Sequence, residues 1–139
     1  MFCLAAGDIL PGTGIGVLRL GASFNQLRET IKNFKTRDLP DYTLIVCANA
    51  KVWVSKEKDA ATQILVFGDF RGKYAGCIGI GSTLFDVRSR LGQSWHDDLD
   101  VYVLDKVPGM AFELGSSDDE DEWDELTAPI EHICVYTTA

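Results

Sequence analysis

The hydrophobic and polar positions in the first half of the chain predict one short helix followed by three strands. Apolar residues spaced three and four apart predict a helix over residues 24–34, with Ser23 as its N-cap. Alternating apolar residues then predict strands at 42–47, 51–55 and 62–67. Between these segments lie Gly, Pro, Asn and charged residues, which favour turns.

The same order of elements returns about sixty positions later in the sequence. The stretch from Gly16 to Arg28 aligns with the stretch from Gly76 to Arg88. Thr83 then takes the N-cap position, and Asp86 stands three residues later, where the acid of a capping box belongs. Such a period indicates two similar units that pack against each other. The strands expected in the second unit are residues 101–104, 110–114 and 130–136.

We therefore predict a single domain over residues 1–139, with an internal repeat at about 14–68 and 74–137. The predicted fold class is α+β, with two tandem units that each consist of a helix followed by three strands. A three-stranded unit alone buries little apolar surface. We expect the units to form one curved antiparallel sheet of about six strands with two helices on one face.

Charge distinguishes the two halves. Residues 1–75 carry ten Lys and Arg against seven Asp and Glu, a balance of +3. Residues 76–139 carry three against fourteen, a balance of −11, and the whole chain has a net charge of −8. Nucleic-acid binding needs the opposite sign, because its affinity comes largely from neutralising phosphates. The acidic half instead favours a basic partner, or serves only solubility.

The N-terminal apolar run is short and has no positively charged residues before it, unlike a signal peptide or a membrane span. The sequence therefore predicts a cytoplasmic protein that does not bind a membrane. Its four cysteines have no Cys-x-x-Cys spacing, and we expect free, buried thiols rather than a disulfide or metal framework. These cysteines are Cys3, Cys47, Cys77 and Cys134.

Two features suggest small-molecule chemistry, but neither is specific. Glycine-rich stretches precede both helices, where a helix N-terminus can bind phosphate. However, they lack the dinucleotide-binding spacing, and tight turns equally explain the glycines. His96 and His132 have no obvious nucleophile beside them, and no metal-binding spacing occurs. We expect no enzyme activity, no catalytic residue, no cofactor and no metal.

The second unit contains an acidic insertion between Gly115 and Glu125 that the first unit lacks. It does not have the spacing of an EF-hand calcium loop. The insertion is either a solvated loop or an interaction surface. Trp123 favours the second interpretation, because an aromatic centre with a charged rim is typical of protein interfaces. The predicted partner-binding residues are Asp118, Asp119, Glu120, Asp121, Glu122, Trp123, Asp124 and Glu125.

These features resemble the immunity proteins of bacterial contact-dependent growth inhibition and polymorphic toxin systems. The resemblance covers about half of the chain and depends on residues 76–87, residues 129–136 and the acidic segment between them. It implies tight, non-covalent neutralisation of a cognate toxin, commonly a basic nuclease acting on tRNA or DNA. An acidic surface would cover the active site of that toxin, without direct contact to nucleic acid.

Two other functions remain open at this point. The first is a non-catalytic adaptor or scaffold subunit of a bacterial protein assembly, which would use the same acidic face. The second is a small-molecule-binding domain or enzyme that uses the glycine-rich loops.

Overall fold

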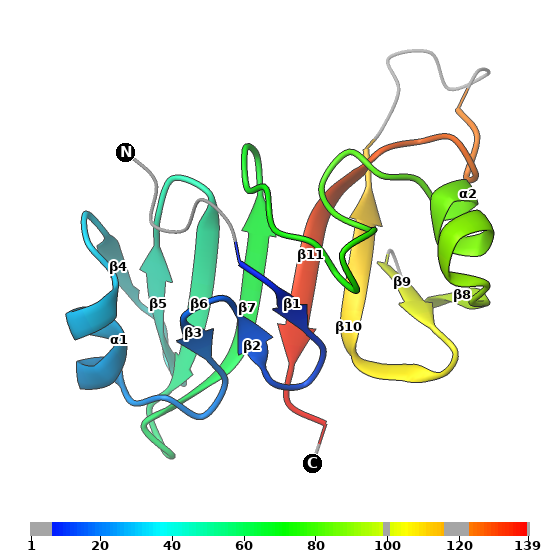
Figure 1. Cartoon of the computed structure of the whole chain (residues 1–139). Coiled ribbons are helices and arrows are strands. Elements are labelled where there is room, and N and C mark those ends of the chain that lie inside the picture. The colour runs from blue at the N-terminus through cyan, green and yellow to red at the C-terminus, as the bar shows by residue number, and fades with distance from the viewer. Residues whose placement is uncertain (1–6, 99–100, 116–122, 139) are drawn as a thin grey trace.

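The computed structural model describes residues 7–98, 101–115 and 123–138, and these residues are mostly β-structure. The large sheet consists of β4 (Lys35–Asp38), β5 (Tyr42–Val46), β6 (Ala50–Ser55), β7 (Ala60–Phe67), β8 (Trp95–Asp98), β9 (Val101–Leu104), β10 (Val107–Leu114) and β11 (Ile130–Tyr136). These eight antiparallel strands lie in the order β4-β5-β6-β7-β11-β10-β9-β8 (Figure 1).

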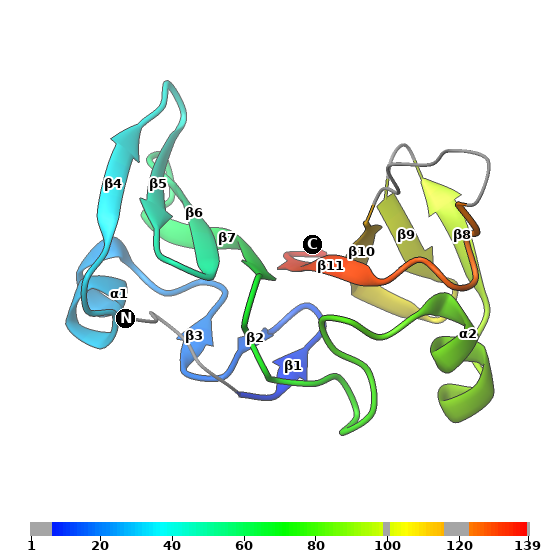
Figure 2. The same ribbon diagram turned by 90° about the horizontal axis from the view of Figure 1, so that it is seen from above.

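A small sheet and two short helices form a second layer. The small sheet has the order β1-β2-β3. It lies across the middle of the large sheet, with one helix at the β4 end and the other at the β8 end (Figures 1 and 2). These elements are β1 (Ile9–Leu10), β2 (Gly14–Ile15), β3 (Leu18–Arg19), α1 (Phe24–Thr30), and α2 (Leu84–Asp86) with its π-helical continuation η1 (Val87–Leu91).

The predicted α+β fold of about six strands with two helices on one face is wrong. The described residues form eleven strands in two sheets, with eight strands in the larger one, and both helices are short. The four residues of β4 are all exposed, and three of the four in β8 are exposed. Strands without a buried side show no apolar alternation, so only their pairing with β5 and β9 reveals them.

The local predictions around the helix starts are confirmed. Ser23 and Thr83 are both N-caps, and each forms a capping box, with Gln26 and Asp86 respectively. The helix predicted to reach residue 34 ends earlier, because Ile31 already has an extended backbone with φ −94° and ψ 133°. Strands 101–104 and 130–136 have the predicted bounds.

The two halves of the large sheet have mirrored strand orders. β4 to β7 form one meander, β8 to β11 form another, and their last strands pair antiparallel at the centre. An approximate two-fold axis between β7 and β11 therefore relates the two meanders. β8 begins sixty residues after β4, and these two strands form the outer edges.

Each glycine-rich loop is tied to the last strand of its own half. The Gly21 N–H donates to the Ala61 carbonyl at 2.8 Å, and the Gly81 N–H donates to the Ile130 carbonyl at 2.8 Å. The two glycines have φ angles of 88° and 93°, a region that strongly favours glycine. These loops therefore have a structural role that recurs at equivalent positions.

The core lies between the large sheet and the second layer. Ile15 and Leu18 of the small sheet, Leu27 of α1 and Leu84 of α2 are all buried there. Because side chains alternate across a strand, the opposite face of the large sheet carries a different set of residues. That face, which we call the open face, includes the half-buried Trp53, Leu65, Cys134 and Tyr136. None of the helices in the described ranges could cross a membrane.

Candidate functional site

Three of the eight residues predicted to bind a partner lie in the described part of the chain. They are Trp123, Asp124 and Glu125, in the segment that leads from β10 to β11. The other five residues, Asp118, Asp119, Glu120, Asp121 and Glu122, lie outside the described residues.

The indole N–H of Trp123 is hydrogen-bonded, and its ring remains partly exposed to solvent. Its indole Nε1–H donates to the carbonyl of Gly115 at 2.8 Å, across the acidic segment. The residue is nevertheless 39% exposed. A tryptophan fixed in this way presents apolar ring surface to a partner with little further loss of side-chain freedom.

Glu125 makes two contacts that its place in an acidic run does not predict. Its carboxylate accepts from Trp95 Nε1–H at 3.4 Å and from the Tyr102 hydroxyl at 3.2 Å. Burial raises the pKa of Tyr102, and the neighbouring Glu125 carboxylate raises it further. Glu125 therefore connects the segment before β11 to β8 and β9, and its carboxylate does not extend freely into solvent.

The segment around Asp124 is also packed against α2. The Asp124 carboxylate accepts the Leu126 N–H at 2.8 Å, and the Leu126 carbonyl accepts the Phe85 N–H at 3.2 Å. Phe85 is 50% exposed, and the Arg88 guanidinium lies 5.6 Å from its ring centre. Phe85 is absent from the predicted binding residues. The sequence does set it apart, because Phe85 aligns with the polar Asn25 of the first unit, so that the second unit has an aromatic residue where the first has a polar one.

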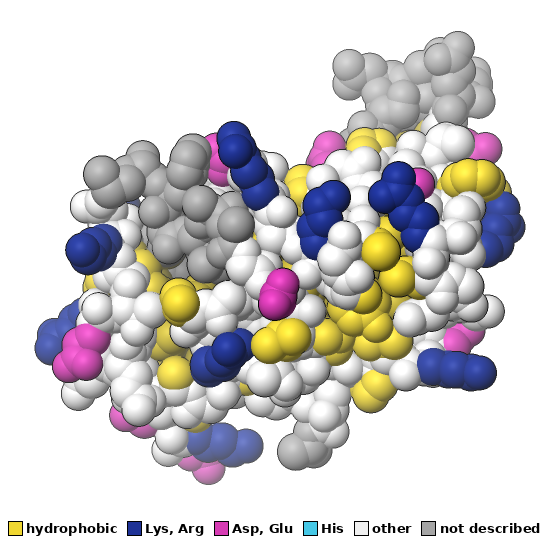
Figure 3. Space-filling view, viewed as in Figure 1, with side chains coloured by type: hydrophobic (Ala, Val, Ile, Leu, Met, Phe, Trp, Pro, Cys, Tyr) yellow, Lys and Arg dark blue, Asp and Glu magenta, His cyan; other side chains and the backbone are white. Residues whose placement is uncertain are grey.

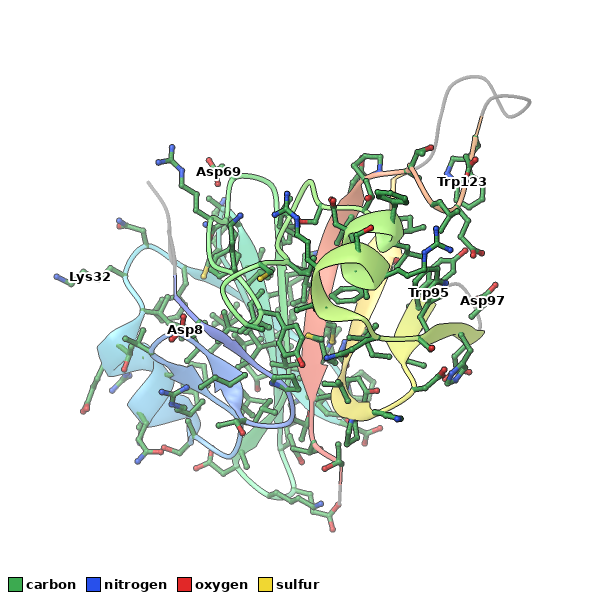
Figure 4. All side chains as sticks on the ribbon, turned by 45° about the vertical axis from the view of Figure 1, so that its right-hand side comes forward. Asp8, Lys32, Asp69, Trp95, Asp97 and Trp123 are labelled. Atoms are coloured by element: carbon green, nitrogen blue, oxygen red, sulfur yellow. The ribbon has the colours of Figure 1, made fainter. Side chains whose placement is uncertain are left out.

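Aromatic and acidic side chains therefore gather at the β8 end of the molecule. Trp95, Asp97 and Trp123 all lie at this end, whereas Lys32 lies at the opposite end (Figure 4). Lys and Arg side chains are spread over both halves of the small-sheet face, so that face is not uniformly acidic (Figure 3). We define the acidic end as the surface formed by Phe85, Trp95, Asp97, Trp123, Asp124 and Glu125.

A separate pocket of about 330 Å³ lies on the open face, where the two halves of the sheet join. This volume is within the range of small-molecule pockets. His132 Nδ1 lies 3.8 Å from Glu113 Oε2, and its ring centre is 5.7 Å from that of Phe67. The residues of the open face that line the pocket are Trp53, Gln63, Leu65, Val101, Ala111, Glu113, His132, Cys134 and Tyr136.

The chemistry of this pocket argues against a cysteine nucleophile. Burial raises the pKa of the Cys134 thiol from 9.0 to about 12, although Gln63 opposes this shift through a hydrogen bond. A thiol with such a pKa is protonated at neutral pH, and the reactive species would be the thiolate. Cys134 therefore has the character of a structural side chain.

The raised pKa of Cys134 predicts a loss of stability at high pH. The folded state binds the thiol proton more tightly than the unfolded state does. The stabilisation that results is complete below pH 9.0 and is lost as the pH rises toward 12. The difference in unfolding free energy between the wild type and Cys134→Ala should therefore shrink over this interval. Urea unfolding at several pH values measures it, and parallel pH profiles would contradict the assignment.

The state of the cysteines differs from the prediction at one position. Cys77 and Cys134 are free, as expected. The prediction is wrong for Cys47, which is disulfide-bonded. Cys3 lies outside the described residues. The absence of a Cys-x-x-Cys spacing does not exclude a bond between residues that are distant in sequence.

The exposed His96 pairs with the carboxylate of Asp105 and not with that of the adjacent Asp97. Its Nδ1 lies 2.5 Å from Asp105 Oδ1, between β8 and the turn after β9. No described Ser or Cys side chain forms a hydrogen bond with this pair. A nucleophile activated by His96 is therefore not assembled among the described residues.

Several backbone donors in the first turns of the two helices are already used within the protein, which leaves fewer of them for a phosphate. The Phe24 N–H donates to Asp59 Oδ1 at 3.2 Å, and the Asp86 N–H donates to Thr83 Oγ1 at 3.1 Å. Phosphate binding at a helix N-terminus depends on such groups being available. Within residues 7–98, 101–115 and 123–138, no cluster of His, Cys, Asp and Glu could hold a metal ion.

The resemblance to immunity proteins stays a prediction, because it depends on the sequence features alone. In comparisons with protein-family models, curated proteins and solved structures, nothing matches this chain.

Proposed function

We propose that this protein is a non-catalytic binding protein that neutralises a basic partner, as an immunity protein neutralises its toxin. The acidic end would contact the partner, and a basic nuclease is the partner whose chemistry fits best. The observation that carries this proposal is Trp123, which is anchored through its indole N–H and exposed beside carboxylates.

The charge of the second half supports a basic partner. Residues 76–139 carry fourteen acidic side chains against three basic ones. Two of those basic side chains already have local contacts, since Arg88 lies over the Phe85 ring and Arg90 Nε is 3.8 Å from Asp86. Such an imbalance accelerates the association of a cationic surface by roughly 10 to 10³-fold at low ionic strength.

The exposed aromatic side chains can supply the apolar contact area that tight binding needs and that charges alone do not provide. Exposed ion pairs contribute little affinity, because water and salt screen them. Tight binding needs a desolvated centre, and Trp is among the residues most enriched at such centres. Trp123 and Phe85 can provide this apolar contact within the acidic end.

The active site of a nuclease attracts phosphates with Lys and Arg, so an acidic surface can occupy it by mimicking the charge of the substrate. The sequence places five further carboxylates, those of residues 118–122, directly before Trp123. Their participation stays a prediction from the sequence.

The proposal is tested by capturing the partner from the native cell and measuring its dissociation constant over a salt series. We expect a basic protein whose affinity falls at least about tenfold between low salt and about 0.5 M salt. Binding that does not depend on salt would contradict the role of the acidic end. Co-expression separates neutralisation from the adaptor alternative, because only neutralisation relieves growth arrest caused by the partner.

A further inference from the structure

Both outer edges of the large sheet are open strands of four residues. Within residues 7–98, 101–115 and 123–138, β4 pairs only with β5, and β8 pairs only with β9. Among the described residues, no backbone hydrogen bond reaches the outer side of either strand. Each edge therefore presents N–H and C=O groups that a further strand can pair with.

The two edges present charges on the same face of the sheet. Arg37 of β4 pairs with Leu44, which in turn pairs with Trp53 of the open face. Asp98 of β8 pairs with Val101, which lines the pocket on the same face. Since directly paired residues share a face, Arg37 and Asp98 both lie on the open face.

The charges of the two edges are opposite in sign. Lys35 lies two residues from Arg37 and therefore on the same face, so β4 presents two cations there. Asp98 is an exposed anion on the open face of β8, and the adjacent Asp97 adds a second negative charge to this strand. Two β4 edges would repel each other, and so would two β8 edges. The third charge of β4, that of Asp38, lies on the opposite face of the sheet and is paired with Lys56 at 2.5 Å. On the open face, therefore, only β4 against β8 brings opposite charges together.

We propose that copies of this chain associate through β4 of one copy and β8 of another. In the full antiparallel overlap of these four-residue strands, Lys35 lies opposite Asp98 of the other copy, with Arg37 diagonal to it. Figure 2 shows both edges turned away from the small sheet, to the same side of the molecule. The remaining β4 and β8 edges can form the same contact again, in a closed pair or in a longer series of copies.

Sedimentation equilibrium of the purified chain over a range of micromolar concentrations tests this contact. We expect a mass above one copy that rises with concentration at about 50 mM salt and decreases at about 500 mM salt. Lys35→Glu alone and Asp98→Lys alone each place like charges in contact. Each should weaken association by at least about tenfold.

The combined variant Lys35→Glu/Asp98→Lys restores opposite charges and should associate within about threefold of the wild type. Matched controls are Lys73→Glu and Asp69→Lys, both exposed in the loop after β7, which make the same charge changes away from both edges. They should leave association unchanged. A single-copy mass at every concentration, or a combined variant no better than the single ones, would overturn the proposal.

Discussion

Trp123→Ala is expected to weaken binding of the basic partner by about 2–4 kcal/mol, roughly 30- to 1,000-fold in the dissociation constant. The indole is already held at Gly115 by a hydrogen bond of 2.8 Å, so binding costs little additional side-chain entropy. Alanine removes the whole apolar surface of the ring. Isothermal titration calorimetry or surface plasmon resonance with the captured partner measures the change.

Two matched variants make the Trp123 result specific. Trp53→Ala removes a half-buried tryptophan on the open face and should change the dissociation constant by less than about threefold. Asp118→Ala removes one carboxylate of the predicted rim and should mainly alter the association rate and its salt dependence. If Trp123→Ala has no larger effect than Asp118→Ala, and both effects are negligible, the acidic end does not form the interface.

Phe112→Ala is expected to lower the free energy of unfolding by about 3–5 kcal/mol. Phe112 lies on β10 and is only 1% exposed, packed in the core between the two layers. Its removal loses buried apolar area and leaves a cavity that the surrounding strands only partly fill. Because domains of this kind have a total stability of roughly 5–15 kcal/mol, this single change is severe. Urea unfolding followed by circular dichroism measures the loss.

Phe85→Ala is the matched control for Phe112→Ala, since it removes the same atoms from a side chain that is 50% exposed. Its expected cost is below about 1 kcal/mol. Should Phe112→Ala fail to fold, Phe112→Leu gives a smaller loss, expected near about 1.5 kcal/mol and measurable in the same way. Equal losses for Phe112→Ala and Phe85→Ala would contradict the placement of Phe112 in the core.

The sequence predicted the inner strands well and the edge strands not at all. Strands such as Val101–Leu104 and Ile130–Tyr136 have one face in the core, so apolar residues recur at alternate positions. The strand Lys35–Asp38 has no buried residue and therefore no such pattern. The small sheet was also missed, because strands of two residues are too short to show any periodicity.

The sequence could select some residues of the candidate site but not the contacts among them. Trp123 could be selected from the sequence because a tryptophan among carboxylates is an unusual composition for a solvated loop. The contacts of Glu125 with Trp95 and Tyr102 could not be, since the partners lie 30 and 23 residues away. Such contacts depend on how β8, β9 and the segment before β11 come together in the fold.

By itself, the sequence determined the capping boxes at Ser23 and Thr83, the inner strands and the separation of charge between the halves. The caps and strands depend on residues within a few positions of each other, and the charges can be counted directly. Only the tertiary structure decided the pairing of β7 with β11, the position of β4 and β8 at the edges and the assembly of the acidic end. These features join residues that are distant in the chain, and no local preference of those residues encodes the contact.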